Sequence, residues 1–131
     1  MENNEILVIY GKEYEKMTRE LLEAADLAGR IGDRGKRIGI KPNLVSPVRA
    51  EEGATTHPAV VEGLLQYLGE NGFHNIAIME GSWVGEKTEH AFLECGYRGL
   101  AARYGAELID TQKEKAKAVD CAGMELHIHF H

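Results

Sequence analysis

Polar side chains suited to binding anions are concentrated in residues 41–57. Lys41 supplies a positive charge, and Thr56-His57-Pro58 has the composition of a helix start, where backbone N–H groups are free. A lysine near a helix N-terminus favours binding of a carboxylate or phosphate. We therefore predict that this segment binds a small anionic molecule. Its candidate ligand-binding residues, including one from the next polar loop, are Lys41, Asn43, Ser46, Arg49, Thr55, Thr56 and Ser82.

Two titratable side chains in the same region are candidates for acid–base chemistry. Glu80 follows an apolar run, and His57 stands at the expected helix start. A carboxylate or an imidazole can exchange a proton with a substrate bound beside it. We therefore take His57 and Glu80 as the candidate catalytic residues. The alternative for His57 is a helix cap, and whether the protein is an enzyme stays open.

Three histidines alternate at the end of the sequence: His127, His129 and His131. In a strand they would share one face at a spacing of about 7 Å, and neighbouring imidazoles can chelate a metal ion. No cysteine or carboxylate cluster nearby in the sequence completes a metal site. A polar edge strand, or residues introduced where the chain was cut, explains them more simply. We predict no metal site and keep the three as candidate ligands.

Two glycine-containing segments come close to nucleotide-binding patterns. Residues 81–88 follow an apolar run and end in Lys-Thr, as does a phosphate-binding loop. Here Glu86 stands directly before Lys87, where that loop requires glycine, and its carboxylate would repel phosphates. The glycines of residues 29–35 precede an expected strand instead of following one. The sequence thus argues against a P-loop hydrolase and against a conventional dinucleotide site.

The elements that must position these residues are strands alternating with helices. Apolar runs predict strands at residues 6–10, 37–41, 76–79 and 106–110, and helical periodicity appears between them. This alternation is typical of parallel sheets with right-handed crossovers. We expect residues 1–131 to form a single α/β domain. Its predicted architecture is three-layer and Rossmann-like, with a mostly parallel sheet, helices on both faces and a C-terminal β-hairpin.

The composition argues against some classes of partner and indicates a cellular compartment. The 131 residues include 15 Lys and Arg against 21 Asp and Glu, a net charge of −6. Nucleic acids and anionic membranes need clustered cations, so we expect neither as a partner. Cys95 and Cys121 are too few for a disulfide framework, and no apolar stretch is long enough to span a membrane. These features predict a cytoplasmic protein.

Four short motifs resemble one family. They are IGIKPNLVSP at residues 38–47, GATTHP at 53–58, EGS at 80–82, and the run from Thr88 to Tyr97. Together they resemble domain-of-unknown-function family 362, over residues 6–110. The resemblance implies an uncharacterised α/β protein, and some members of the family are fused to ferredoxin-like iron–sulfur domains. This chain lacks CxxC motifs, so we expect no iron–sulfur ligands within it, and its cofactor is unknown.

The family pattern continues past the motifs found here, which predicts that this chain is the amino-terminal part of a longer protein. Its expected partners are a small anionic molecule and either a second copy of the chain or the missing downstream domain. The function that we predict is anion binding at the carboxyl ends of the strands, where ligands bind in open parallel sheets. The alternative is a non-catalytic module of a larger iron–sulfur or redox protein.

Overall fold

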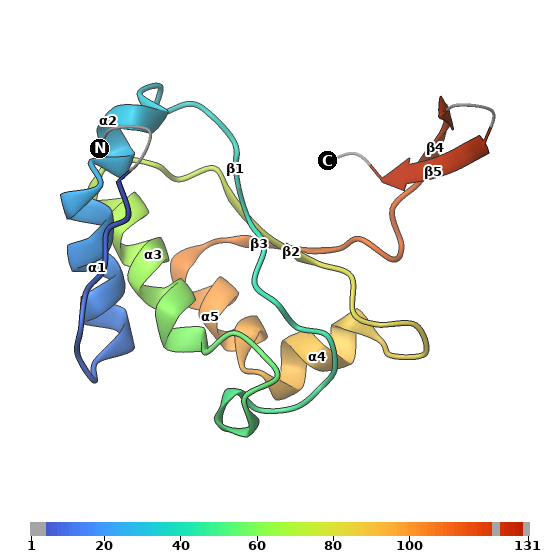
Figure 1. Ribbon diagram of the computed structural model, residues 1–131, viewed down its shortest axis with the longest axis horizontal. Coiled ribbons are helices and arrows are strands. Elements are labelled where there is room, and N and C mark those ends of the chain that lie inside the picture. The colour runs from blue at the N-terminus through green and yellow to red at the C-terminus, as the bar shows by residue number, and fades with distance from the viewer. Residues whose placement is uncertain (1–4, 122–123, 130–131) are drawn as a thin grey trace.

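Three parallel strands form the sheet, in the order β1-β2-β3 (Figure 1). The computed structural model describes residues 5–121 and 124–129. Its elements in chain order are α1 (Tyr14–Ala24), α2 (Leu27–Ile31), β1 (Ile38–Ile40), the 3₁₀ helix η1 (Ala50–Glu52), α3 (Pro58–Glu70), β2 (Ile76–Glu80), α4 (Thr88–Glu94), α5 (Tyr97–Tyr104), β3 (Glu107–Asp110), β4 (Ala116–Cys121) and β5 (Met124–His129). The predicted α/β class and parallel sheet are confirmed.

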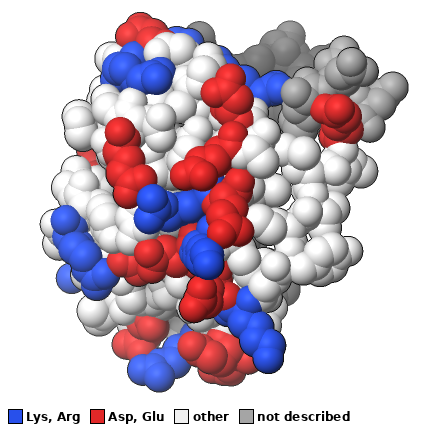
Figure 2. All heavy atoms as spheres, turned by 90° about the vertical axis from the view of Figure 1, so that its left-hand side faces the viewer, with Lys and Arg blue, Asp and Glu red and all other residues white. Residues whose placement is uncertain are grey.

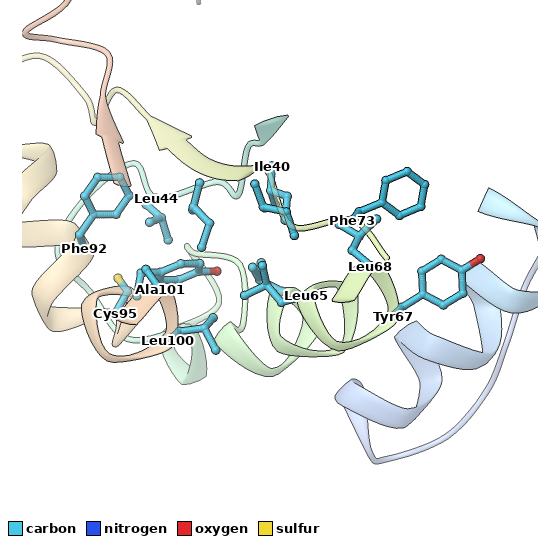
Figure 3. Packing of buried hydrophobic residues seen from close by; sticks show 14 of the residues in the cluster. Ile40, Leu44, Leu65, Tyr67, Leu68, Phe73, Phe92, Cys95, Leu100 and Ala101 are labelled. Carbon is cyan, nitrogen blue, oxygen red and sulfur yellow. The ribbon is translucent and has the colours of Figure 1, made fainter. Parts of the chain in front are cut away.

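The sheet packs through one face onto the helices. Ile40 of β1, Ile78 of β2 and Leu108 of β3 are in register and belong to the same apolar cluster as the helices. Figure 3 shows this core between the strands and the helices. Because the strand order follows the chain order, both right-handed crossovers bring their helices to the same face. The expected second helical layer is therefore not found among the described residues.

Helix α3 shows how the sequence builds this layer. Pro58 occupies its first turn, where a missing N–H costs nothing, and Val61, Leu65 and Leu68 are buried along one side. Gly63 brings α1 close, since a Cβ there would collide with the backbone carbonyl of Glu15. Helix α1 therefore packs directly against α3, beside the sheet.

The strand predicted at residues 6–10 is wrong. The segment is extended but lies outside both sheets, and Ile6 and Tyr10 are 87% and 91% exposed. Leu7 and Ile9 are half-buried and line a groove with Met17 of α1. The apolar face of the helix covers every second side chain, which gives the segment a strand-like pattern without a neighbouring strand.

The C-terminal strands β4 and β5 pair antiparallel. Residues 122–123, which would join them, lie outside the described residues, so the predicted hairpin stays a prediction. None of the helices in the described part of the chain is long and apolar enough to cross a membrane.

Candidate functional site

The carboxyl ends of β1 and β2 are joined by an ion pair between Lys41 and Glu80. Lys41 follows β1, and its Nζ lies 3.0 Å from Oε2 of Glu80, the last residue of β2. The Glu80 side chain is only 4% exposed, whereas that of Lys41 is 64% exposed. The buried carboxylate therefore fixes an ammonium group that remains open to solvent.

Backbone donors occupy both oxygens of Glu80. The N–H of Leu44 donates to Oε2 and the N–H of Gly81 donates to Oε1, each at 2.8 Å. Leu44 is fully buried, and its side chain points into the core near Phe92 (Figure 3). Glu80 thus anchors the chain leaving β1 to the end of β2. This use of its oxygens fits an anchor better than the predicted catalytic base.

Several predicted ligand-binding side chains hold the loop of residues 41–57 together. Asn43 and Thr56 are joined by two hydrogen bonds, from Asn43 N to Thr56 Oγ1 and from Thr56 N to Asn43 O. The Asn43 side chain also donates to Ala54 O at 3.0 Å. Thr55 Oγ1 donates to Val48 O at 3.0 Å. These bonds give the loop a defined shape.

Ser82 connects this loop to the next one. Its hydroxyl donates to Leu44 O at 2.8 Å, and its own N–H donates to Oγ1 of the buried Thr88 at 3.0 Å. Trp83 N donates to Val45 O at 2.9 Å. The loops after β1 and β2 are therefore held side by side at the carboxyl edge of the sheet.

Arg49 lies in a different place from Lys41. It is exposed and lines an open pocket of about 210 Å³ with Cys95 and Gly96, at the junction of α4 and α5; Lys41 does not line this pocket. Ser46 is half-buried and does not line this pocket. The structure thus does not bring Arg49 and Lys41 into one pocket.

Cys95 holds the loop of residues 41–57 through a hydrogen bond to its backbone. It is 6% exposed, and its thiol donates to Val48 O at 3.1 Å. Burial raises the pKa of this thiol, and the negative charge of Glu94 adds to the effect, although a hydrogen bond with Thr55 opposes it. Cys95 is accordingly a protonated packing residue at neutral pH.

His57 caps helix α3. Its Nδ1 accepts a hydrogen bond from Ala59 N at 3.2 Å, and its ring centroid lies 4.7 Å from that of Tyr14. The other ring nitrogen, Nε2, lies 4.0 Å from Oε1 of Glu51. The cap that the sequence left open as an alternative is therefore formed, and it occupies the lone pair of Nδ1, the acceptor nitrogen of the neutral ring.

Sequence reasoning missed Gln112. Its Nε2 donates to Ser82 O at 2.8 Å and to Glu86 O at 3.3 Å, which ties the exit of β3 to the loop after β2. A polar residue two positions after a predicted strand was the available signal. Nearby, Lys113 contacts Glu89 and Asp110 at 3.0 and 3.3 Å. Its hydrogen bond to Glu89 lowers the pKa of that carboxyl group, and Arg98 contributes in the same direction.

Charges of both signs are interspersed on the face that carries α1 (Figure 2). Arg19 of α1, for example, lies 2.7 Å from Glu70 of α3, and Lys16 lies 3.9 Å from Glu20. Such exposed ion pairs add little to the stability of the fold. Because each cation is paired with a carboxylate, they do not form a concentrated positive surface. This face therefore differs from the carboxyl edge, where a buried carboxylate anchors the exposed side chain of Lys41.

The candidate metal ligands stand at the end of the sequence. The side chains of His127 and His129 and the whole of His131 lie outside the described residues. Within the described residues, no group of three or more His, Cys, Asp or Glu side chains is placed to hold a metal ion. A metal site at the end of the sequence stays untested.

Comparison with known proteins gives one match. No curated protein and no solved structure matches the chain. The model of one family, described as a domain of unknown function, matches residues 38–130, which are 93 of the 131 residues. The matched region begins at β1 and includes Lys41, the loop of residues 41–57 and Glu80. The resemblance seen in the sequence motifs is thereby confirmed, and the chain belongs to the DUF362 family.

Proposed function

We propose that the protein binds a small anionic molecule at the carboxyl edge of its sheet, through the ammonium group of Lys41. The observation that carries the proposal is the 3.0 Å contact between this exposed ammonium and the buried carboxylate of Glu80. A long lysine side chain normally loses conformational freedom when it binds a ligand. The contact with Glu80 removes part of that freedom in advance, which favours binding.

The charge balance at the edge also supports the proposal. Glu80 accepts two backbone N–H groups besides the ammonium, so its negative charge is compensated from three directions. The ammonium has three donor hydrogens, and Lys41 Nζ is otherwise 3.5 Å from Pro42 O. A carboxylate or phosphate oxygen can therefore accept a hydrogen bond from Lys41 without displacing Glu80.

We assign different roles to the other candidate residues. Asn43, Thr55, Thr56 and Ser82 position the two loops through the hydrogen bonds described above. They determine where Lys41 stands and do not need to touch the ligand. In this proposal the anion contacts the ammonium group of Lys41, and the loops at the carboxyl edge hold that group in place.

The test is a calorimetric titration of the 131-residue chain with inorganic phosphate and, separately, with acetate. Lys41→Ala should weaken binding of the preferred anion by roughly tenfold or more, the range expected for a hydrogen bond to a charged group. Lys36→Ala is the matched control, because Lys36 stands before β1 and donates to Ile31 O at 2.9 Å, away from the carboxyl edge. Circular dichroism of each variant verifies the fold.

Three results would contradict the proposal. One is that the wild-type chain binds neither anion, and another is that Lys41→Ala binds as tightly as the wild type. The third is that Lys36→Ala weakens binding as much as Lys41→Ala, which would assign any observed affinity to net charge alone.

A further inference from the structure

The loop after β2 holds two large apolar side chains in solvent. Trp83 is 72% exposed and Val84 is 95% exposed, although both lie in an ordered turn. Trp83 N donates to Val45 O, and Trp83 O accepts from Glu86 N, both at 2.9 Å. Gln112 further fixes the loop through the carbonyl groups on either side of this turn. The exposed indole is therefore attached to a backbone that is held from two neighbouring loops.

This indole stands at the same edge as Lys41. Lys41 Nζ contacts Glu80, Glu80 accepts from Leu44 N, and the next residue, Val45, accepts from Trp83 N. With standard backbone lengths, these contacts limit the distance from Lys41 Nζ to Trp83 N to about 16 Å. The two residues are therefore close enough along this edge for one small molecule to contact both.

We propose that the ligand of this edge is an anion that carries a planar aromatic or heteroaromatic ring, with the anionic group on Lys41 and the ring stacked on Trp83. The inference rests on the proposed function and specifies its ligand. Tryptophan offers a large, rigid surface. Because its loop is already fixed, little conformational entropy is lost when a ligand binds to it. Every planar ring has a face that can stack on it.

Two other occupants fit the surroundings less well. A single-stranded nucleic acid also combines rings with anionic groups, but a chain of net charge −6 repels a polyanion. A second protein would need an apolar area larger than one indole and one valine side chain, and the neighbouring Glu86 and Lys87 are charged and exposed. A small ring-bearing anion needs only the one exposed indole and the one ammonium group that this edge offers.

The experiment compares adenosine monophosphate, adenosine and inorganic phosphate as calorimetric probes of the 131-residue chain. We expect the monophosphate to bind more tightly than either of the others. Trp83→Ala should weaken its binding by about 5- to 150-fold, the range for one stacked base, and leave phosphate binding unchanged. Trp83→Phe should restore most of the loss. Tyr10→Ala removes an aromatic ring that is 91% exposed on the N-terminal segment, and serves as the matched control.

The sequence offers an independent readout, since Trp83 is the single tryptophan of the chain. Its fluorescence should change on addition of the monophosphate and stay nearly constant with phosphate alone. Benzoate and acetate form a parallel pair that distinguishes a carboxylate from a phosphate as the anionic group. Trp83-dependent binding of either ring-bearing anion supports the inference.

The outcomes separate this inference from the proposed function. If phosphate binds through Lys41 but a ring adds no affinity, or Trp83→Ala has no effect, the inference is wrong and the proposed function stands. If no anion depends on Lys41, both are wrong. Association of two copies that is lost in Trp83→Ala, measured by analytical ultracentrifugation, would instead assign the indole to self-association and overturn the inference.

Discussion

Leu44 N and Lys41 Nζ donate to the same oxygen of Glu80, at 2.8 and 3.0 Å, so one carboxylate fixes both a backbone turn and a charged side chain. Leu44 is simultaneously buried in the core. The position of the ammonium at the carboxyl edge is therefore coupled to the packing of the sheet against its helices. Any change that removes this carboxylate should alter stability and binding together.

Replacing Glu80 with glutamine tests this coupling. The amide retains one acceptor oxygen, so either the buried N–H of Leu44 or the more exposed N–H of Gly81 loses its partner, and a loss at Leu44 is the costly one. A buried donor without a partner costs about 1–3 kcal/mol, and urea unfolding should show a loss of that size. Glu107→Gln is the control, because Glu107 pairs with Arg37 while both side chains are more than half exposed. Glu107→Gln should lower the free energy of unfolding by no more than about 1 kcal/mol. Equal losses in the two variants would show that Glu80 is not an anchor.

The core beneath the edge gives a second prediction. Leu65 of α3 is 1% exposed within the apolar cluster, whereas Leu93 of α4 is 54% exposed. Leu65→Ala should lower the free energy of unfolding by about 2–5 kcal/mol, because it leaves a cavity. Leu93→Ala makes the same chemical change at the surface and should cost less than about 0.5 kcal/mol. Denaturant unfolding of the two variants, with equal m-values, checks the difference.

The sequence was sufficient where structure depends on local patterns. The strands expected at residues 37–41, 76–79 and 106–110 appear as Ile38–Ile40, Ile76–Glu80 and Glu107–Asp110. The break between α4 and α5 also follows a local rule, because Gly96 has φ of 81° and a glycine adopts that angle without strain. The segment at residues 6–10 has the continuous apolar run of a buried strand, and only its packing against α1, with no neighbouring strand, distinguishes it from one.

The roles of the site residues depend on partners distant in sequence. Glu80 is an anchor because Leu44, 36 residues earlier, places its N–H on the carboxylate. Asn43 holds its own loop together because Thr56, 13 residues later, lies opposite it and forms a hydrogen bond with it. No periodicity encodes these pairs, so sequence reasoning could place the residues at one edge but could not separate the residues that face solvent from those that hold the loops together.

Variants of His57 distinguish a cap from a base. Nδ1 of His57 accepts from Ala59 N at the first turn of α3. His57→Ala should destabilise the protein by about 0.5–2 kcal/mol, and His57→Asn should recover most of that loss because asparagine is a strong N-cap. Thermal unfolding measures both. A stability loss that asparagine does not reduce would indicate that the contact with the Tyr14 ring, and not the cap, is what matters.

The network at the exit of β3 makes stability depend on pH in a defined direction. The folded-state pKa of Glu89 lies below its ordinary value of 4.5, chiefly because of its hydrogen bond to Lys113 and then that to Arg98. The ionised form is therefore favoured in the folded protein, and its stabilisation is present above pH 4.5 and is lost as pH falls through the folded-state pKa. Glu89→Gln should be slightly less stable than the wild type near neutral pH, and the difference should disappear in acid. Glu94→Gln, one turn further along α4, is the control for a general charge effect. If the stability difference between Glu89→Gln and the wild type persists unchanged in acid, the ion pair of Glu89 with Lys113 is not the cause of that difference.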